Sequence, residues 1–146
     1  MQFSTVVVLL ATLTSSALAL PAPQPSASAP PTWTIEGFRR QCATDGGPCS
    51  YSFAVNTNDG SAATPCSYSV SGSLEDPPAR KTYQGLVCGA FTVGSIWSGQ
   101  FGEDAGFQTL SVVKGQKIVY PAYTDVQLQS GKVVVPDQSY PVQPTL

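Results

Sequence analysis

Cysteines are the most reactive side chains in this chain, and no histidine accompanies them. The four are Cys42, Cys49, Cys66 and Cys88. Without histidine the chain cannot form a Ser-His-Asp or Cys-His catalytic arrangement. A zinc site made of four cysteines usually contains Cys-x-x-Cys pairs, which this spacing lacks. Cysteines held in disulfides are not nucleophiles, so we expect crosslinks here, with neither a metal nor a cofactor.

Carboxylates are the other groups that could catalyse a reaction, because glycoside hydrolysis needs only two of them across a cleft. Most of the nine Asp and Glu residues fall in turn-like segments. The neighbours Glu103 and Asp104 are typical of solvated loop charge. With Asp59 they are also calcium-ligand candidates, but no spacing matches a known calcium loop. We therefore predict that the protein is not an enzyme, with a carboxylate hydrolase as an alternative.

Two turn-like segments carry large aromatic side chains. Trp97 and Phe101 lie in a stretch with Gly99 and Gly102, and Tyr120 and Tyr123 flank Pro121 and Ala122. Exposed aromatic residues on loops often anchor binding partners. The candidate recognition residues are therefore Trp97, Phe101, Tyr120 and Tyr123. Packing of the loop itself is the alternative role for each ring.

The first nineteen residues have the features of a secretory signal peptide. Residues 6–13 are an apolar run that is too short to span a bilayer. Ala17-Leu18-Ala19 then places small residues at the expected cleavage positions. No later segment is long and apolar enough to act as a membrane anchor. We expect secretion into an oxidising environment, where the cysteines pair.

The rest of the chain divides into an arm and one domain. Residues 20–31 are rich in Pro, Ala and Ser and carry no charge, so they cannot bury enough surface to fold. Residues 32–146 have the length of a single domain. The net charge is −2 and the seven basic residues are scattered, so no basic face for nucleic acid is expected.

A period of two dominates the domain. Residues 49–55 and 66–72 alternate large apolar with small polar side chains, which predicts half-buried antiparallel strands. A bulge is expected at Gly37 in the first strand. The expected strands are 32–41, 49–55, 66–72, 83–88, 90–97, 107–113, 117–120 and 132–135. Several short strands separated by turns predict an all-β antiparallel sandwich or barrel. The one expected helix is 124–129, with Thr124 as its N-cap.

The strand assignment favours one of the three possible disulfide pairings. Cys42 ends one strand and Cys49 begins the next across a Gly/Pro turn, while Cys66 and Cys88 lie on strands that flank a polar loop. We therefore predict Cys42–Cys49 and Cys66–Cys88. The two crossed pairings stay open at the level of sequence.

Several segments together resemble one known family. These segments are 33–42 (WTIEGFRRQC), 49–53 (CSYSF), 64–68 (TPCSY), 88–93 (CGAFTV), 97–101 (WSGQF), 106–113 (GFQTLSVV) and 118–125 (IVYPAYTD). They resemble the small secreted fungal elicitors called hypersensitive-response-inducing proteins, which are related to the domain class typified by the major Alternaria allergen. The resemblance implies a β-sandwich or barrel with internal disulfides.

The resemblance also implies a function. It points to an apoplastic effector that binds a plant cell-surface or apoplastic protein and provokes defence or cell death without a catalytic step. The alternative is a secreted β-module that binds a small phenolic molecule or a glycan through a concave site lined by the candidate aromatic residues.

Overall fold

The computed structural model describes residues 28–146. The expected signal peptide (1–19) and residues 20–27 of the expected arm lie outside the described residues. The strands are β1 (Thr32–Cys42), β2 (Cys49–Asn56), β3 (Thr64–Val70), β4 (Tyr83–Cys88), β5 (Phe91–Ser98), β6 (Phe107–Lys114), β7 (Lys117–Val119), β8 (Ala122–Thr124), β9 (Gln138–Pro141) and β10 (Gln143–Pro144). Three short 3₁₀ turns are η1 (Pro78–Arg80), η2 (Glu103–Ala105) and η3 (Gln129–Gly131).

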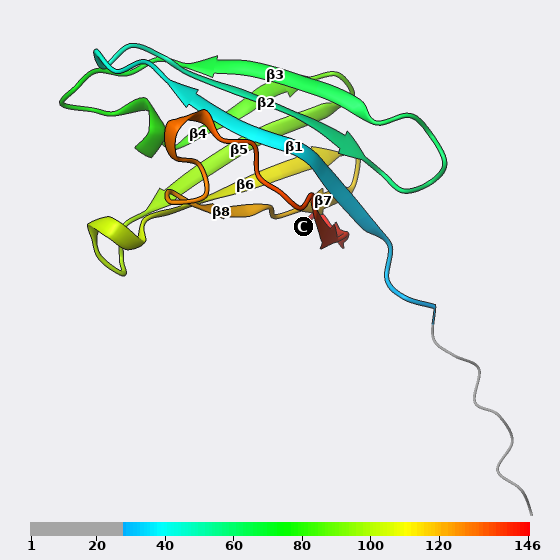
Figure 1. Cartoon of the computed structure of the whole chain (residues 1–146). Helices are drawn as coiled ribbons and strands as arrows, with labels where there is room; N and C mark the ends of the chain where they lie inside the picture. The colour runs from blue at the N-terminus through cyan, green and yellow to red at the C-terminus, as the bar shows by residue number, and fades with distance from the viewer. Residues whose placement is uncertain (1–27) are drawn as a thin grey trace, which may run out of the picture.

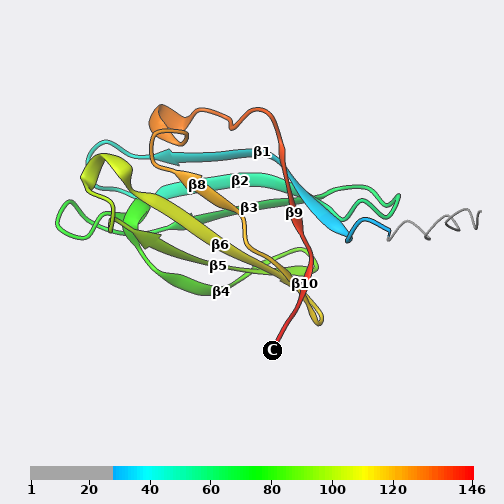
Figure 2. The same ribbon diagram turned by 90° about the horizontal axis from the view of Figure 1, so that it is seen from below.

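The strands form two antiparallel sheets packed face to face (Figures 1 and 2). One sheet has the order β3-β2-β1-β9, and the other has the order β10-β7-β6-β5-β4 with β8 also paired to β6. The chain passes directly from β9 in one sheet to β10 in the other, so it joins the sheets along one side. The expected all-β antiparallel architecture is confirmed.

The core lies between the sheets and is rich in aromatic rings. In strand β2 the side chains alternate strictly between buried and less buried positions, and the buried ones include Tyr51 and Phe53. Phe38 from β1 stacks on Tyr123 from β8 with ring centroids 4.1 Å apart. Trp33 and Phe91 meet edge to face across the two sheets. These contacts fix the sheets against each other.

A bulge at Gly37 changes which side chains of β1 face the core. The register of β1 against β2 shifts between Glu36 and Arg39, and Gly37 has a φ of +59°. Such a backbone is readily adopted by glycine. Before the bulge Ile35 is buried, and after it Phe38 and Arg40 are buried. The bulge expected from the sequence therefore places an arginine on the inner face.

The two disulfides have the pairing that the strand assignment favours. Cys42–Cys49 crosslinks β1 to β2 at directly opposite positions. Cys66–Cys88 links β3 to β4, which are the edge strands of opposite sheets. The second crosslink therefore holds the sheets together on the side away from β9 and β10.

The expected strand at 132–135 is wrong. Only an isolated bridge between Arg39 and Val133 and one bond from the Val134 N–H to the Phe38 carbonyl (2.8 Å) connect this segment to β1. Pro136 follows and has no N–H to donate, so the ladder stops. Pairing with β1 resumes at β9, which the sequence did not predict.

The expected helix at 124–129 is also wrong, although its cap is present. Thr124 and Gln127 exchange the reciprocal bonds of a capping box. Only one turn follows, in which the Leu128 N–H reaches the Thr124 carbonyl at 3.3 Å. The chain then enters η3, where Ser130 has a φ of +57° that ends any helix. A single turn is too short to propagate.

Candidate functional site

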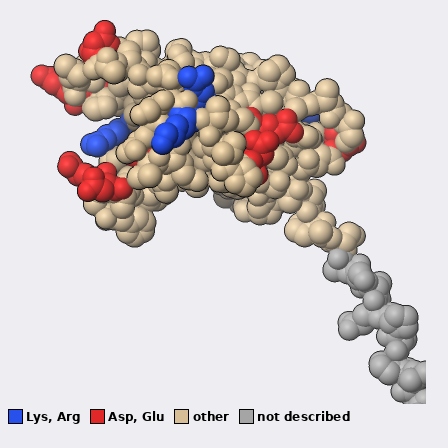
Figure 3. Space-filling view, viewed as in Figure 1, with Lys and Arg blue, Asp and Glu red and all other residues tan. Residues whose placement is uncertain are grey.

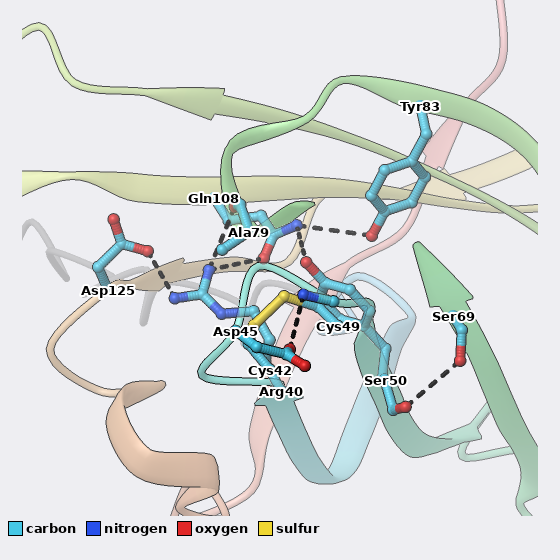
Figure 4. Close-up of a disulfide and its surroundings, with 12 residues drawn as sticks. Arg40, Cys42, Asp45, Cys49, Ser50, Ser69, Ala79, Tyr83, Gln108 and Asp125 are labelled. Carbon is cyan, nitrogen blue, oxygen red and sulfur yellow. Dashed lines mark hydrogen bonds and ion pairs between the residues drawn. A yellow bond between two sulfur atoms is a disulfide. The ribbon is translucent and has the colours of Figure 1, made fainter. Parts of the chain in front are cut away.

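Arg40 is the centre of a polar cluster at one end of the sandwich (Figure 4). The Arg40 residue is only 7% exposed. Nη2 donates to Oδ1 of Asp125 at 2.8 Å, forming an ion pair. Nη1 donates longer bonds of 3.4 Å to the Ala79 carbonyl and to Oε1 of Gln108. The guanidinium therefore ties β1 to β6, to η1 and to the turn after β8.

Gln108 connects Arg40 to further polar side chains between the sheets. Its fully buried amide donates to Oγ of Ser95 at 2.7 Å and to the Tyr51 hydroxyl at 3.2 Å. The Tyr68 and Tyr83 hydroxyls bond to each other at 2.8 Å. Burial raises the pKa of the Tyr51, Tyr68 and Tyr83 hydroxyls, so these groups stay protonated. The cluster thus contains one ion pair surrounded by neutral hydrogen-bonding groups.

Trp97 belongs to the base of this cluster and is half-buried. Its indole N–H donates to Oδ2 of Asp125 at 2.8 Å, and the Arg80 guanidinium lies 4.8 Å above the ring centroid. Gly99 and Gly106 pack against the ring so closely that a Cβ atom would lie 2.5 Å and 2.9 Å from its carbon atoms. Both positions therefore require glycine. Trp97 fixes the base of the loop that follows it.

Phe101 lies further along this segment, residues 97–107, which we call the aromatic loop. Its side chain is 71% exposed, and its ring stacks on Phe107 with centroids 6.0 Å apart. The turn η2 in the same loop presents Glu103 and Asp104 to solvent. The loop therefore combines a fixed base with an exposed aromatic ring and two negative charges.

A hollow of about 350 Å³ lies beside the aromatic loop. The ion pair of Arg40 and Asp125 contributes to its wall, together with Arg80, Glu103 and Asp104. Figure 3 shows basic and acidic side chains gathered at this end of the sandwich. Both Asp125 oxygens are engaged, one by Arg40 and one by Trp97. The Asp125 side chain is therefore held in place from β1 and from β5.

The structure does not bring the four predicted recognition residues together. Trp97 and Phe101 share the aromatic loop, and Tyr120 is 48% exposed beside a shallow hollow of about 70 Å³ that Ile96 also lines. Tyr123 is 1% exposed and stacked on Phe38, so it is a core residue and no partner can reach it. The four rings therefore do not line one common concave site, and a recognition role for Trp97, Phe101 or Tyr120 stays a prediction.

Arg40 and Gln108 are the residues that sequence reasoning missed. A signal for Arg40 did exist, because counting the period of two through a bulge at Gly37 places it on the inner face. Gln108 lies on the same buried face of β6 as Leu110. Its partners come from β1, β2, β4 and β5, and no local pattern reveals such distant contacts.

The calcium alternative also lacks a common site. Asp59 lines a hollow at the opposite end of the sandwich from Glu103 and Asp104. Within residues 28–146, no three His, Cys, Asp or Glu side chains are grouped as metal ligands would be. In the same part of the chain, no helix has the length and apolar character needed to cross a membrane.

Comparison with known proteins decides the family. A family model described as Effector TSP1 matches residues 34–146. The chain belongs to the Effector TSP1 family. An Effector TSP1 from Hypocrea virens (strain Gv29-8 / FGSC 10586) is 42% identical over 138 residues, which cover 90% of this chain and 92% of the relative. The expected membership of a fungal effector family is confirmed, and the relation to the Alternaria allergen stays a prediction.

Proposed function

We propose that this effector is secreted and acts without catalysis, by binding a plant cell-surface or apoplastic protein and provoking a defence or hypersensitive response. The effector family is the starting point. Secretion is supported by the signal-peptide-like sequence of residues 1–19 and by the two disulfides. Phe101, exposed at 71% on a loop with a fixed base, is the observation that carries the binding role.

The geometry of the aromatic loop suits recognition of a protein. Aromatic side chains dominate the binding energy of protein interfaces because they bury a large apolar area. A loop that is already ordered loses less conformational entropy on binding. Trp97, its two glycine neighbours and Asp125 supply that order here. Glu103 and Asp104 add negative charge beside the ring, which favours a partner with basic residues around an apolar pocket.

Leaf infiltration with purified protein tests this function. We expect the unmodified protein to elicit a response, Phe101→Ala to lose most of it, and Leu74→Ala to retain it. Leu74 is a matched control because it is 74% exposed on a different loop. Each variant is first shown to be folded by circular dichroism. Absence of any response to the unmodified protein in several hosts, or equal activity of the two variants, would contradict the proposal.

The alternative function is binding of a small molecule or glycan. It is supported by a hollow that none of the four candidate aromatic residues lines. This hollow of about 550 Å³ lies at the end of the sandwich opposite the aromatic loop.

A further inference from the structure

The hollow at the end of the sandwich opposite the aromatic loop is lined by residues from both sheets, and we call it the lysine pocket. The β6–β7 hairpin contributes Lys114, Gln116 and Lys117, and the β2–β3 loop contributes Asp59. The start of β1 and the β9–β10 segment contribute Trp33 and Val142. In Figure 1 the β2–β3 loop and the start of β1 lie at the end of the sandwich away from η2.

Two lysines in this pocket face the same way without a carboxylate partner. Lys114 and Lys117 are directly opposite in the β6–β7 hairpin. Like charges in such positions repel and destabilise the sheet. The two ion pairs found within residues 28–146 involve neither of them. Lys114 instead lies over the Phe91 ring, with its Nζ 5.3 Å from the centroid. An anion bound between the two ammonium groups would relieve this repulsion.

Asp59 supplies a fixed hydrogen-bond acceptor in the same pocket. Its Oδ1 accepts bonds from the backbone N–H and the hydroxyl of Ser61, which lower the pKa of Asp59 to about 2. The loop itself is held on β1, because Nδ2 of Asn58 donates to the Thr32 carbonyl at 3.0 Å. The Asp59 carboxylate therefore stays charged and in place over the pH range of plant tissue.

The apolar part of the pocket is also fixed. Trp33 is almost completely buried and lines the pocket together with Val142 and Pro31. The Val142 N–H donates to the Pro31 carbonyl at 2.9 Å, which holds these two residues together. The lysine pocket thus offers a small apolar surface, an acceptor, an amide from Gln116 and two ammonium groups.

We propose that the lysine pocket binds a uronate, which is a sugar ring that bears a carboxylate. The carboxylate would lie between Lys114 and Lys117, and ring hydroxyls would donate to Asp59 and bond with the Gln116 amide. The C–H face of the ring would rest on Val142 and Pro31. A neutral sugar would leave the two ammonium groups unpaired, and a simple inorganic anion would leave Asp59 and the apolar surface unused.

Titration of ¹⁵N-labelled protein with digalacturonate, followed by NMR, tests this proposal. We expect saturable shifts of the Lys114, Lys117 and Asp59 amides, and weaker binding at high salt because exposed charges are screened. Cellobiose and inorganic phosphate are the comparison ligands, and both should bind much more weakly. No saturable shift with digalacturonate, or equal affinity for cellobiose or phosphate, would overturn the proposal.

Lysine variants locate the site. Lys114→Gln and Lys117→Gln should each weaken digalacturonate binding by about fivefold, the upper value for one exposed ion pair. Lys132→Gln is the matched control, because Lys132 is exposed, lies outside the pocket and makes none of the ion pairs found within residues 28–146. Equal weakening by all three variants would overturn the assignment. The leaf response should survive both pocket variants, so a failure here is distinguishable from failure of the proposed function.

Discussion

Within residues 28–146, charged side chains are buried and paired at one end of the sandwich, and exposed without an ion pair at the other. In the polar cluster, buried Arg40 is paired with Asp125, and the amide of Gln108 has hydrogen-bond partners on neighbouring strands. In the lysine pocket, Lys114 and Lys117 repel each other and are exposed. The difference follows from burial, because an unpaired charge is expensive only where water cannot reach it. The polar cluster therefore holds the fold and the aromatic loop, while the lysine pocket has charge available for a ligand.

Breaking the ion pair should have the largest effect on stability. Arg40→Met leaves the Asp125 carboxylate without its cation and is expected to lower the free energy of unfolding by about 2–3 kcal/mol. This is below the full range for a buried pair because the Asp125 side chain is 24% exposed. Urea denaturation measures the change. Arg39→Met, on the exposed neighbour of the same strand, should stay within about 0.5 kcal/mol, and equal losses would refute the central role of Arg40.

A smaller loss is expected when only the anchor of the aromatic loop is weakened. Trp97→Phe keeps a ring near Arg80 but removes the N–H that donates to Asp125. The expected loss is about 1.5 kcal/mol, the lower value for a hydrogen bond to a charged group. Hydrogen exchange of amides 99–106 should become faster while exchange in β2 is unchanged. Unchanged exchange in the loop would show that Trp97 does not hold it.

The smallest effect concerns Asp59 at the other end. Ser61→Ala removes the bond from the Ser61 hydroxyl and should raise the pKa of Asp59 from about 2 toward its ordinary value of 3.8. The depressed pKa stabilises the folded state above about pH 4, and this contribution is lost as the pH falls toward 2. The unmodified protein should therefore exceed Ser61→Ala in stability at pH 6 but not at pH 2. NMR titration of the Asp59 carboxyl carbon measures the shift, with Ser67→Ala as the exposed control.

Sequence patterns predicted the parts of the fold that depend on neighbours along the chain. The alternation in residues 49–55 predicted β2, and strand ends close together predicted the Cys42–Cys49 bond. Strand β9 was missed because its proline-flanked sequence has little strand character by itself and depends on pairing with β1. Tyr123 looked like a turn residue because β8 is only three residues long and depends on pairing with β6.

The candidate site was predicted less completely than the fold. Trp97 and Phe101 were found because large rings between glycines are visible in the sequence. Their different roles were not visible, since the role of Trp97 depends on Asp125, which lies 28 residues away. The lysine pocket was not found either, because its residues come from four separate segments.

The dose of protein that gives a half-maximal leaf response, measured beside the free energy of unfolding, tests the central claim most directly. The claim is that the polar cluster stabilises the protein while the exposed ring of Phe101 performs recognition. For Phe101→Ala we predict a dose at least tenfold higher, which corresponds to the loss of about 1.4 kcal/mol of binding energy, with unfolding changed by no more than about 0.5 kcal/mol. An unchanged dose for a folded Phe101→Ala protein would contradict the account.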